Sequence, residues 1–293
     1  MPAASVTSRI TLRNILFATD FSDVSKAALP YAMDLARLYD GKIVVAHVVP
    51  HEAYLSVPLE PLPIDLDLMW NREKQELADF TSRGSFGSVP HEDVLQRGDL
   101  WEVIADIIET RHIDLVVTGT RGRSGLKKMV LGSTAERIYR KAHCPVLTIG
   151  PEAAETRRAG WELKRILFAT DFSETSLHAL PFALSLAEEN QANLIFLNVA
   201  PLTPYLYKEA VEASTRRKLE VLMPAEPWCS AEFVVSFEFP AQGILQVAGE
   251  RNADLIVMGV KKPVAAGLTS HLPWSIASDV VGAASCPVLT VRG

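Results

Sequence analysis

NILFATDFS occupies residues Asn14–Ser22 and RILFATDFS occupies residues Arg165–Ser173, so eight of nine residues agree. Two further segments repeat in the same order: DLVVTG at 114–119 is matched by DLIVMG at 254–259, and CPVLT at 144–148 returns at 286–290. Tandem duplication of one domain explains all three matches. The sequence therefore predicts two copies of the same fold.

The chain has 293 residues, which is enough for two domains of ordinary size. We place the first domain at residues 1–150 and the second at residues 163–293. The segment 151–162 between them is polar and contains Pro and Gly, which is typical of a linker. Each copy is then long enough to fold around its own core.

Composition excludes several classes of protein. The net charge of −6 argues against a general nucleic-acid binder, because such proteins need a basic face. No apolar run approaches the length of a membrane span, and the first residues do not resemble a signal peptide. The three cysteines are far apart and form no metal-ligand spacing. We therefore expect a cytoplasmic protein with no membrane partner, no structural disulfide and no metal site of its own.

Within the first copy, short runs rich in Val and Ile alternate with longer runs of helical period, a pattern typical of βαβ units. Strands are expected at Ile15–Thr19, Ile43–Val49, Val89–Gln96, Leu115–Gly119 and Val146–Ile149. Helices are expected after Ser22 or Asp23 as N-cap, and at Asp65–Ser82, Leu100–Thr110 and Ser133–Lys141. The expected fold class is α/β, with two tandem, open, doubly wound parallel sheets of five strands. The last strand of each copy should pair with the other, because each is a sheet edge that needs covering.

Ligands bind such sheets beyond the carboxyl ends of the strands. After the fourth strand of the first copy the chain reads Gly119-x2-Gly122-x9-Gly132-Ser133, followed by Thr134. Glycine lets the backbone approach a ligand closely, and the start of a helix offers free N–H groups to an anion. The spacing differs from the Walker and dinucleotide fingerprints. It predicts a different kind of phosphate cradle at this edge.

At these residues the sequence resembles the universal stress protein family, through FATDFS, the His47-Val48 pair, the glycine motif and CPVLT. The resemblance implies an adenine nucleotide alpha hydrolase-like fold with strand order 3-2-1-4-5, and a role in stress adaptation. It also implies ATP as ligand, with the aspartate after the first strand and the valine after the histidine near adenine and ribose, and the glycine motif on ribose and phosphates. Carried over by position, these roles fall on Asp20, Val48, Gly119, Gly122, Gly132 and Ser133, with Thr134 adjacent.

The second copy departs from this pattern. Lys262 stands opposite Gly122, and Trp274 stands opposite Gly132. A Trp at the helix start would fill the space that a phosphate needs, and Pro263 and Pro273 further restrict the backbone. We predict that the second copy binds a nucleoside triphosphate poorly or not at all, whereas Lys261 and Lys262 can still hold a smaller anion.

Several of these candidate residues also have a purely structural explanation. Asp20 and Asp171 can act as capping carboxylates, a role we favour for Asp171 only. Arg123 lies in a basic loop that is equally compatible with phosphate contact and with solvation. His47 is expected to be a structural histidine. Cys144 and Cys286 are expected to be inert packing thiols.

Three functions remain open, and we expect no catalytic residue. The leading one is a regulatory ATP-binding protein, in which any Mg²⁺ is held mainly by the phosphates. The alternatives are a slow nucleotide hydrolase or transferase and a nucleotide-free interaction or carrier module. One chain would correspond to a pseudo-dimer of two domains, and further homo-oligomers stay open.

Overall fold

The computed structural model describes residues 9–50, 66–83, 86–120, 133–156, 160–202, 204–225, 229–261 and 272–293. In the first copy the strands are β1 (Asn14–Ala18), β2 (Lys42–Val49), β3 (His91–Arg97), β4 (Leu115–Gly119) and β5 (Val146–Ile149). Its helices are α1 (Asp23–Leu38), α2 (Leu66–Arg83), α3 (Leu100–Thr110) and α4 (Ser133–Lys141), and α5 (Pro151–Thr156) follows.

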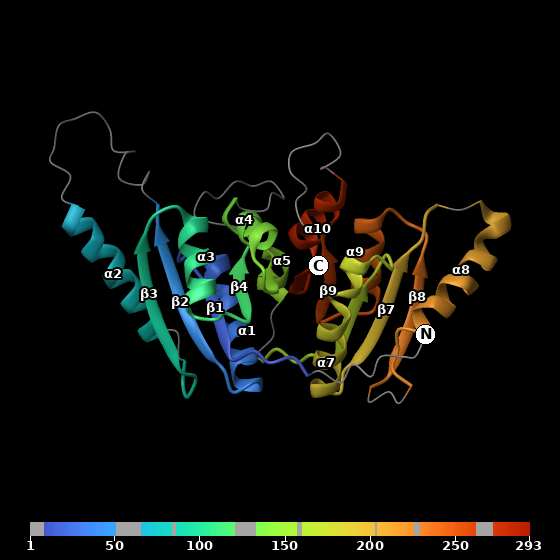
Figure 1. Cartoon of the computed structure of the whole chain (residues 1–293), viewed down its shortest axis with the longest axis horizontal. Coiled ribbons are helices and arrows are strands. Elements are labelled where there is room, and N and C mark those ends of the chain that lie inside the picture. Colours follow the sequence, from blue (N-terminus) through green and yellow to red (C-terminus); the bar gives the residue numbers. More distant parts are fainter. Residues whose placement is uncertain are drawn as a thin grey trace.

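The second copy repeats this alternation (Figure 1). Its strands are β6 (Arg165–Ala169), β7 (Asn193–Val199), β8 (Ala231–Ser236), β9 (Leu255–Val260) and β10 (Val288–Arg292). Its helices are α6 (Glu174–Leu177), α7 (Leu180–Asn190), α8 (Tyr205–Glu220), α9 (Pro240–Glu250) and α10 (Leu272–Ala283).

The strands form one ten-stranded sheet in the order β3-β2-β1-β4-β5-β10-β9-β6-β7-β8. Each half is parallel and has the expected order 3-2-1-4-5. The two halves meet where β5 pairs antiparallel with β10, which confirms the predicted pairing of the last strands. This pairing joins the two predicted sheets of five strands into one continuous sheet.

Two apolar layers cover the sheet, and each extends through both copies. One layer contains buried residues of α1, α2, α5, α7 and α8, and the other contains those of α3, α4, α9 and α10. The outer helices α2 and α8 lie at opposite ends of the molecule (Figure 1). Parallel strands covered on both faces explain why β1, β4, β6 and β9 are almost entirely buried.

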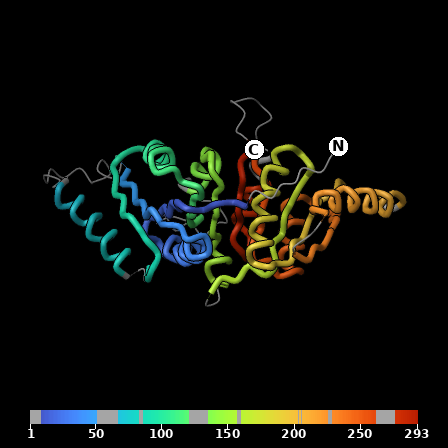
Figure 2. Tube along the Cα trace, turned by 60° about the horizontal axis from the view of Figure 1, so that its bottom comes forward, coloured from blue at the N-terminus to red at the C-terminus, as the bar shows by residue number. Residues whose placement is uncertain are grey.

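Side chains reinforce the junction between the copies. Thr148 Oγ1 donates to the Val288 carbonyl at 3.1 Å, and Thr290 Oγ1 donates to the Val146 carbonyl at 3.2 Å. The chain before β1 also crosses over, because Ile10 N donates to Ser185 Oγ of α7 at 3.0 Å. Figure 2 shows this N-terminal stretch running towards the second copy.

Several predicted boundaries agree with the structure. Strands β4 and β5 and helices α3 and α4 have the expected bounds, and Ser22 is the N-cap of α1, where its side chain accepts from Ser25 N. Strand β3 begins two residues later than expected, after Pro90, which has no N–H for the ladder. Among the described residues, none of the helices is both long enough and apolar enough to cross a membrane.

The segment expected as a linker is partly helical. Residues Pro151–Thr156 form α5, and Ala153 is fully buried against the shared apolar layer. Tyr31 Oη donates to the Ala153 carbonyl at 3.0 Å, and the Tyr31 ring meets Trp161 edge-on at 5.0 Å. The connection is therefore packed onto the first copy, which the polar composition of the segment did not reveal.

Candidate functional site

The predicted site residues follow three neighbouring strands. Ala18 of β1 is in register with Ala46 of β2 and with Thr118 of β4, so Asp20, Val48 and Gly119 all lie at the carboxyl edge of the sheet. Ser133 and Thr134 form the first residues of α4. Gly122, Arg123 and Gly132, and the side chains of Ser133 and Thr134, lie outside the described residues. The structure thus brings together the strand-end half of the predicted site.

The turn after β1 is held by its own side chains. Thr19 Oγ1 accepts from Phe21 N at 3.0 Å and from Ser25 Oγ at 2.8 Å. Asp20 Oδ1 accepts from Ser22 N at 3.1 Å. Phe21 has a φ of 63°, a left-handed conformation that is uncommon for a bulky residue and is tolerated where the surroundings fix it. This local network orients the start of α1.

The second copy repeats the turn. Phe172 has a φ of 62°, and its N–H donates to Thr170 Oγ1 at 3.0 Å. Asp171 Oδ1 accepts from Ser173 N at 3.0 Å and from Ser173 Oγ at 2.5 Å. Burial opposes ionisation of Asp171, but hydrogen bonds from Ser173 and Ser176 and the charge of Lys261 together lower its pKa. The capping role favoured for Asp171 is wrong, because Ser173 is the N-cap of α6 and accepts from Ser176 N. Asp171 instead closes the turn before the helix, as Asp20 does in the first copy.

His47 is a buried histidine with two partners. Its Nδ1 lies 2.8 Å from the Thr19 carbonyl, and its Nε2 lies 3.1 Å from Glu73 Oε2 on α2. The imidazole also packs against the Phe21 ring, with 4.3 Å between the ring centroids. In the second copy Asn198 Nδ2 donates to the Thr170 carbonyl at 2.8 Å. His47 and Asn198 thus have the same structural role: each donates a hydrogen bond to the threonine carbonyl in the turn after the first strand.

Gly119 has a packing reason that is independent of any ligand. A Cβ at this position would lie 3.0 Å from Ser25 N and 3.0 Å from the Val24 carbonyl oxygen, at the start of α1. Gly259 is even more confined, since a Cβ there would lie 2.2 Å from the Thr175 carbonyl oxygen. In both copies the first glycine of the motif therefore lies where the first helix approaches closely, and the approach leaves less room at Gly259 than at Gly119.

Thr120 is a residue that the sequence reasoning missed. It follows Gly119, is 2% exposed, and its hydroxyl has no hydrogen-bond partner among the residues that the structure describes. A buried hydroxyl without a partner is costly, so such groups are rare unless something else satisfies them. Its counterpart in the second copy is Val260, which has a methyl group in place of the hydroxyl. A comparison of the two copies at the strand ends would have drawn attention to it.

A cavity is found at the equivalent edge of the second copy. It has a volume of about 310 Å³ and lies beyond β6, β7 and β9, towards α9 and α10. Its lining includes Asp171, Val199, Gly259, Val260 and Lys261. By register these residues correspond to Asp20, Val48, Gly119, Thr120 and residue 121 of the first copy. In the second copy, a cavity therefore lies at the strand edge where the sequence predicted a site.

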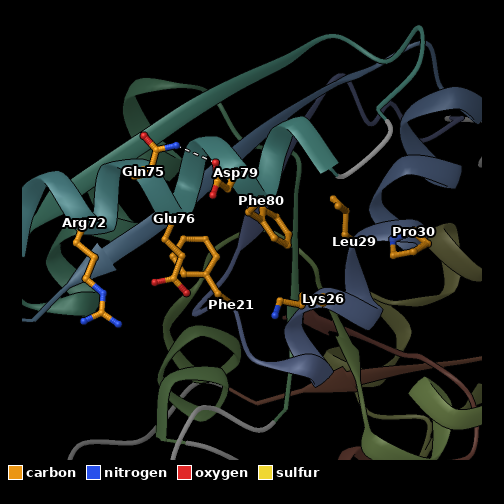
Figure 3. Close-up of a pocket in the computed structure, with 9 residues that line it drawn as sticks. All are labelled: Phe21, Lys26, Leu29, Pro30, Arg72, Gln75, Glu76, Asp79 and Phe80. Atoms are coloured by element: carbon orange, nitrogen blue, oxygen red, sulfur yellow. Dashed lines mark hydrogen bonds between the residues drawn. The ribbon is translucent and has the colours of Figure 1, made fainter.

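A larger hollow lies on the other face of the first copy, between α1 and α2. It has a volume of about 830 Å³ and is lined by Phe21, Lys26, Leu29, Pro30, Arg72, Gln75, Glu76, Asp79 and Phe80 (Figure 3). Phe21 and Phe80 pack with ring centroids 5.5 Å apart at its base. Charges of both signs line it, so no single class of ligand is indicated. Phe21 connects this groove with the turn after β1.

No cluster of three His, Cys, Asp or Glu side chains able to hold a metal ion occurs in the described part of the chain. Cys144 and Cys286 lie just before β5 and β10, and burial raises the pKa of each thiol to about 12. Such thiols stay protonated at neutral pH and are poor nucleophiles.

Comparison with known proteins gives a consistent result. A sequence model of the universal stress protein family matches residues 11–150 and 162–292. A universal stress protein of Methanocaldococcus jannaschii is 31% identical over 139 residues, covering 47% of this chain and 81% of that protein. One of Mycolicibacterium smegmatis is 25% identical over 296 residues, covering 95% of this chain and 96% of that protein. The crystal structure of a universal stress protein from Archaeoglobus fulgidus has a similar fold, with a TM-score of 0.71 at 20% identity, over 97% of this chain and 99% of that chain.

Proposed function

Because the chain belongs to the universal stress protein family, we propose that its N-terminal copy binds ATP as a regulatory ligand in stress adaptation in the cytoplasm. The observation that carries the proposal is the Thr120 hydroxyl, which is buried at the carboxyl edge of β4 and has no partner among the described residues. A polar ligand at this edge would supply that partner.

The residues that would hold ATP are Asp20, Val48, Gly119, Gly122, Arg123, Gly132, Ser133 and Thr134, to which we add Thr120. Asp20 and the Val48 backbone are assigned to the nucleoside. The glycine motif and the start of α4 are assigned to the phosphates, because N–H groups at the start of a helix favour an anion. Arg123 would add a positive charge for the phosphates. Any Mg²⁺ would be held chiefly by the phosphates themselves.

Hydrolysis is not part of the proposed function. Rapid cleavage of ATP needs a group that aims or deprotonates a water at the γ-phosphate. Asp20 is the carboxylate that we place nearest to the nucleotide, and its Oδ1 already accepts from Ser22 N. ATP would then act by occupying the site rather than by turnover.

The internal arrangement supports a further part of the proposal. The antiparallel pairing of β5 with β10 relates the two copies as the subunits of a dimer are related. We assign the chain the role of a pseudo-dimer in which one half senses nucleotide and the other half completes the sheet.

Calorimetric titration with ATP tests the proposed function. We expect one site per chain in the wild type, a loss of binding in Gly122→Lys, which introduces the second copy's residue, and unchanged binding in Asp171→Ala. Hydrolysis of labelled ATP well above background, abolished by Asp20→Ala, would replace the proposal by the enzyme alternative. Absence of binding to the wild type would favour the interaction module instead.

A further inference from the structure

The cavity of the second copy has a mainly apolar wall. Its lining residues are Ala169, Thr170, Asp171, Ser173, Thr175, Ser176, Leu197, Val199, Pro240, Ile244, Met258, Gly259, Val260, Lys261 and Ile276. Ile244 of α9 and Ile276 of α10 approach it from one face of the sheet, and Met258 and Val260 form the end of β9. The volume of about 310 Å³ is at the lower end of the range of small-molecule sites.

At four positions of this wall the second copy has a more apolar side chain than the first copy. Strand register aligns Leu197 with Ala46, Met258 with Thr118 and Val260 with Thr120. Alignment of the CPVLT strands places Ile276 opposite Thr134. Three hydroxyl-bearing residues and one alanine are thus replaced by four apolar side chains, of which Leu197, Met258 and Ile276 are also larger. The second copy therefore lines its cavity with apolar side chains at positions where the first copy carries three hydroxyl groups.

The charged part of the lining is small. Asp171 and Lys261 are both exposed, so they mark the opening of the cavity to solvent. A polyanion placed there would meet the negative charge of Asp171 and only one described cation of the lining, Lys261. A neutral ligand avoids this repulsion, and a donor group on it can reach the carboxylate at the opening.

We propose that the C-terminal copy binds a small, neutral, mainly apolar organic molecule, with its apolar body against Met258, Val260 and Ile276 and one N–H or O–H group directed at Asp171. The two copies would then bind ligands of different chemistry at the same place in the fold. This site is independent of ATP binding by the N-terminal copy.

The experiment uses 5-fluoroindole as the probe, titrated into the full-length chain and followed by ¹⁹F NMR. We expect saturable binding at one site per chain. Met258→Thr/Val260→Thr, which introduces the residues of the first copy, should weaken binding at least tenfold. The matched control Thr120→Val, which makes the reverse change in the first copy, should leave the affinity within twofold of the wild type. Circular dichroism melting of each variant checks that it is folded.

A second variant protects the test against a local folding defect. Ile244→Phe places a larger side chain in the cavity from α9 and so reduces the space for a ligand. Because it leaves β9 unchanged, it tests the cavity separately, and it should also weaken binding of 5-fluoroindole. Absence of saturable binding to the wild type, or equal affinity in the wild type and in both cavity variants, would overturn the proposal. Displacement of the probe by ATP would also overturn it, because the second copy would then be a nucleotide site. The calorimetric titration of Gly122→Lys reports separately on the first copy.

Discussion

The turn after the first strand is nearly the same in the two copies, whereas the wall of the hollow behind it is not. Phe21 and Phe172 share a left-handed conformation, and their N–H groups donate to Thr19 Oγ1 and Thr170 Oγ1, respectively. By contrast, Thr118 and Thr120 at the end of β4 are replaced by Met258 and Val260 at the end of β9. The turn that satisfies its own backbone is thus shared by the two copies, whereas several positions of the cavity wall differ between them.

Asp114 and Asp254, which occupy equivalent positions in the two copies, also have the same structural role. Asp114 Oδ2 accepts from Arg13 N and Asn14 N, each at 2.9 Å. Asp254 Oδ2 accepts from Lys164 N at 3.0 Å and from Arg165 N at 2.8 Å. Both carboxylates therefore hold the beginning of the central strand in place. A residue shared by the two copies is here a sign of folding, not of ligand binding.

The largest difference in stability is expected between the two strand-end glycines. Gly259→Ala places a Cβ 2.2 Å from the Thr175 carbonyl oxygen, so α6 must move, and we expect a loss of about 3 kcal/mol or more. Gly119→Ala meets its nearest atoms at 3.0 Å and should cost about 1 kcal/mol. Urea unfolding of both variants measures this. Equal losses would show that packing of the first helix does not distinguish the two copies.

A smaller loss of stability is expected from substitutions of His47, which donates to the turn after β1. His47→Ala leaves the buried Thr19 carbonyl without its Nδ1 donor and should lower the free energy of unfolding by about 2 kcal/mol. His47→Asn supplies the group that the second copy uses and should recover about half of that loss. Asn198→Ala is the matched control in the second copy. A His47→Asn variant as unstable as His47→Ala would contradict the shared role of the two residues.

Substitutions on the two sides of the β5–β10 junction should lower stability by equal amounts. Thr148→Val and Thr290→Val each remove one hydrogen bond between β5 and β10, at a cost of about 1 kcal/mol. Thermal unfolding of the two variants should therefore give the same shift. Unequal shifts would indicate that the junction is not symmetric in solution.

The smallest effect concerns the cysteines. Cys144 and Cys286 have a pKa of about 12, raised by burial, so the stability gained by keeping them protonated is present below the ordinary thiol pKa and is lost as pH rises towards 12. Alkylation with iodoacetamide should be slow at both positions at pH 7 and should accelerate at higher pH. Cys229 is less buried, although burial raises its pKa too, and should react first. Mass spectrometry of the tryptic peptides reads out the order.

Much of the fold was predictable because periodicity and repeats report directly on it. The pairing of β5 with β10 follows from the need to cover sheet edges, whereas the strand order within each copy came from the resemblance to the universal stress protein family. The helix α5 was not predictable, since Ala153 is buried by contacts that come from distant parts of the chain. At the site, Asp20, Val48 and Gly119 were placed correctly at one sheet edge. Thr120 was missed because a lone threonine carries no motif, and the packing role of Gly119 was missed because it depends on how closely α1 approaches β4.

Native mass spectrometry of the full-length chain with ATP tests the asymmetry between the copies most directly. The account predicts one ATP per chain in the wild type, weaker occupancy in Thr120→Val, and unchanged occupancy in Val260→Thr. Two ATP molecules per chain, or equal occupancy in all three proteins, would contradict it.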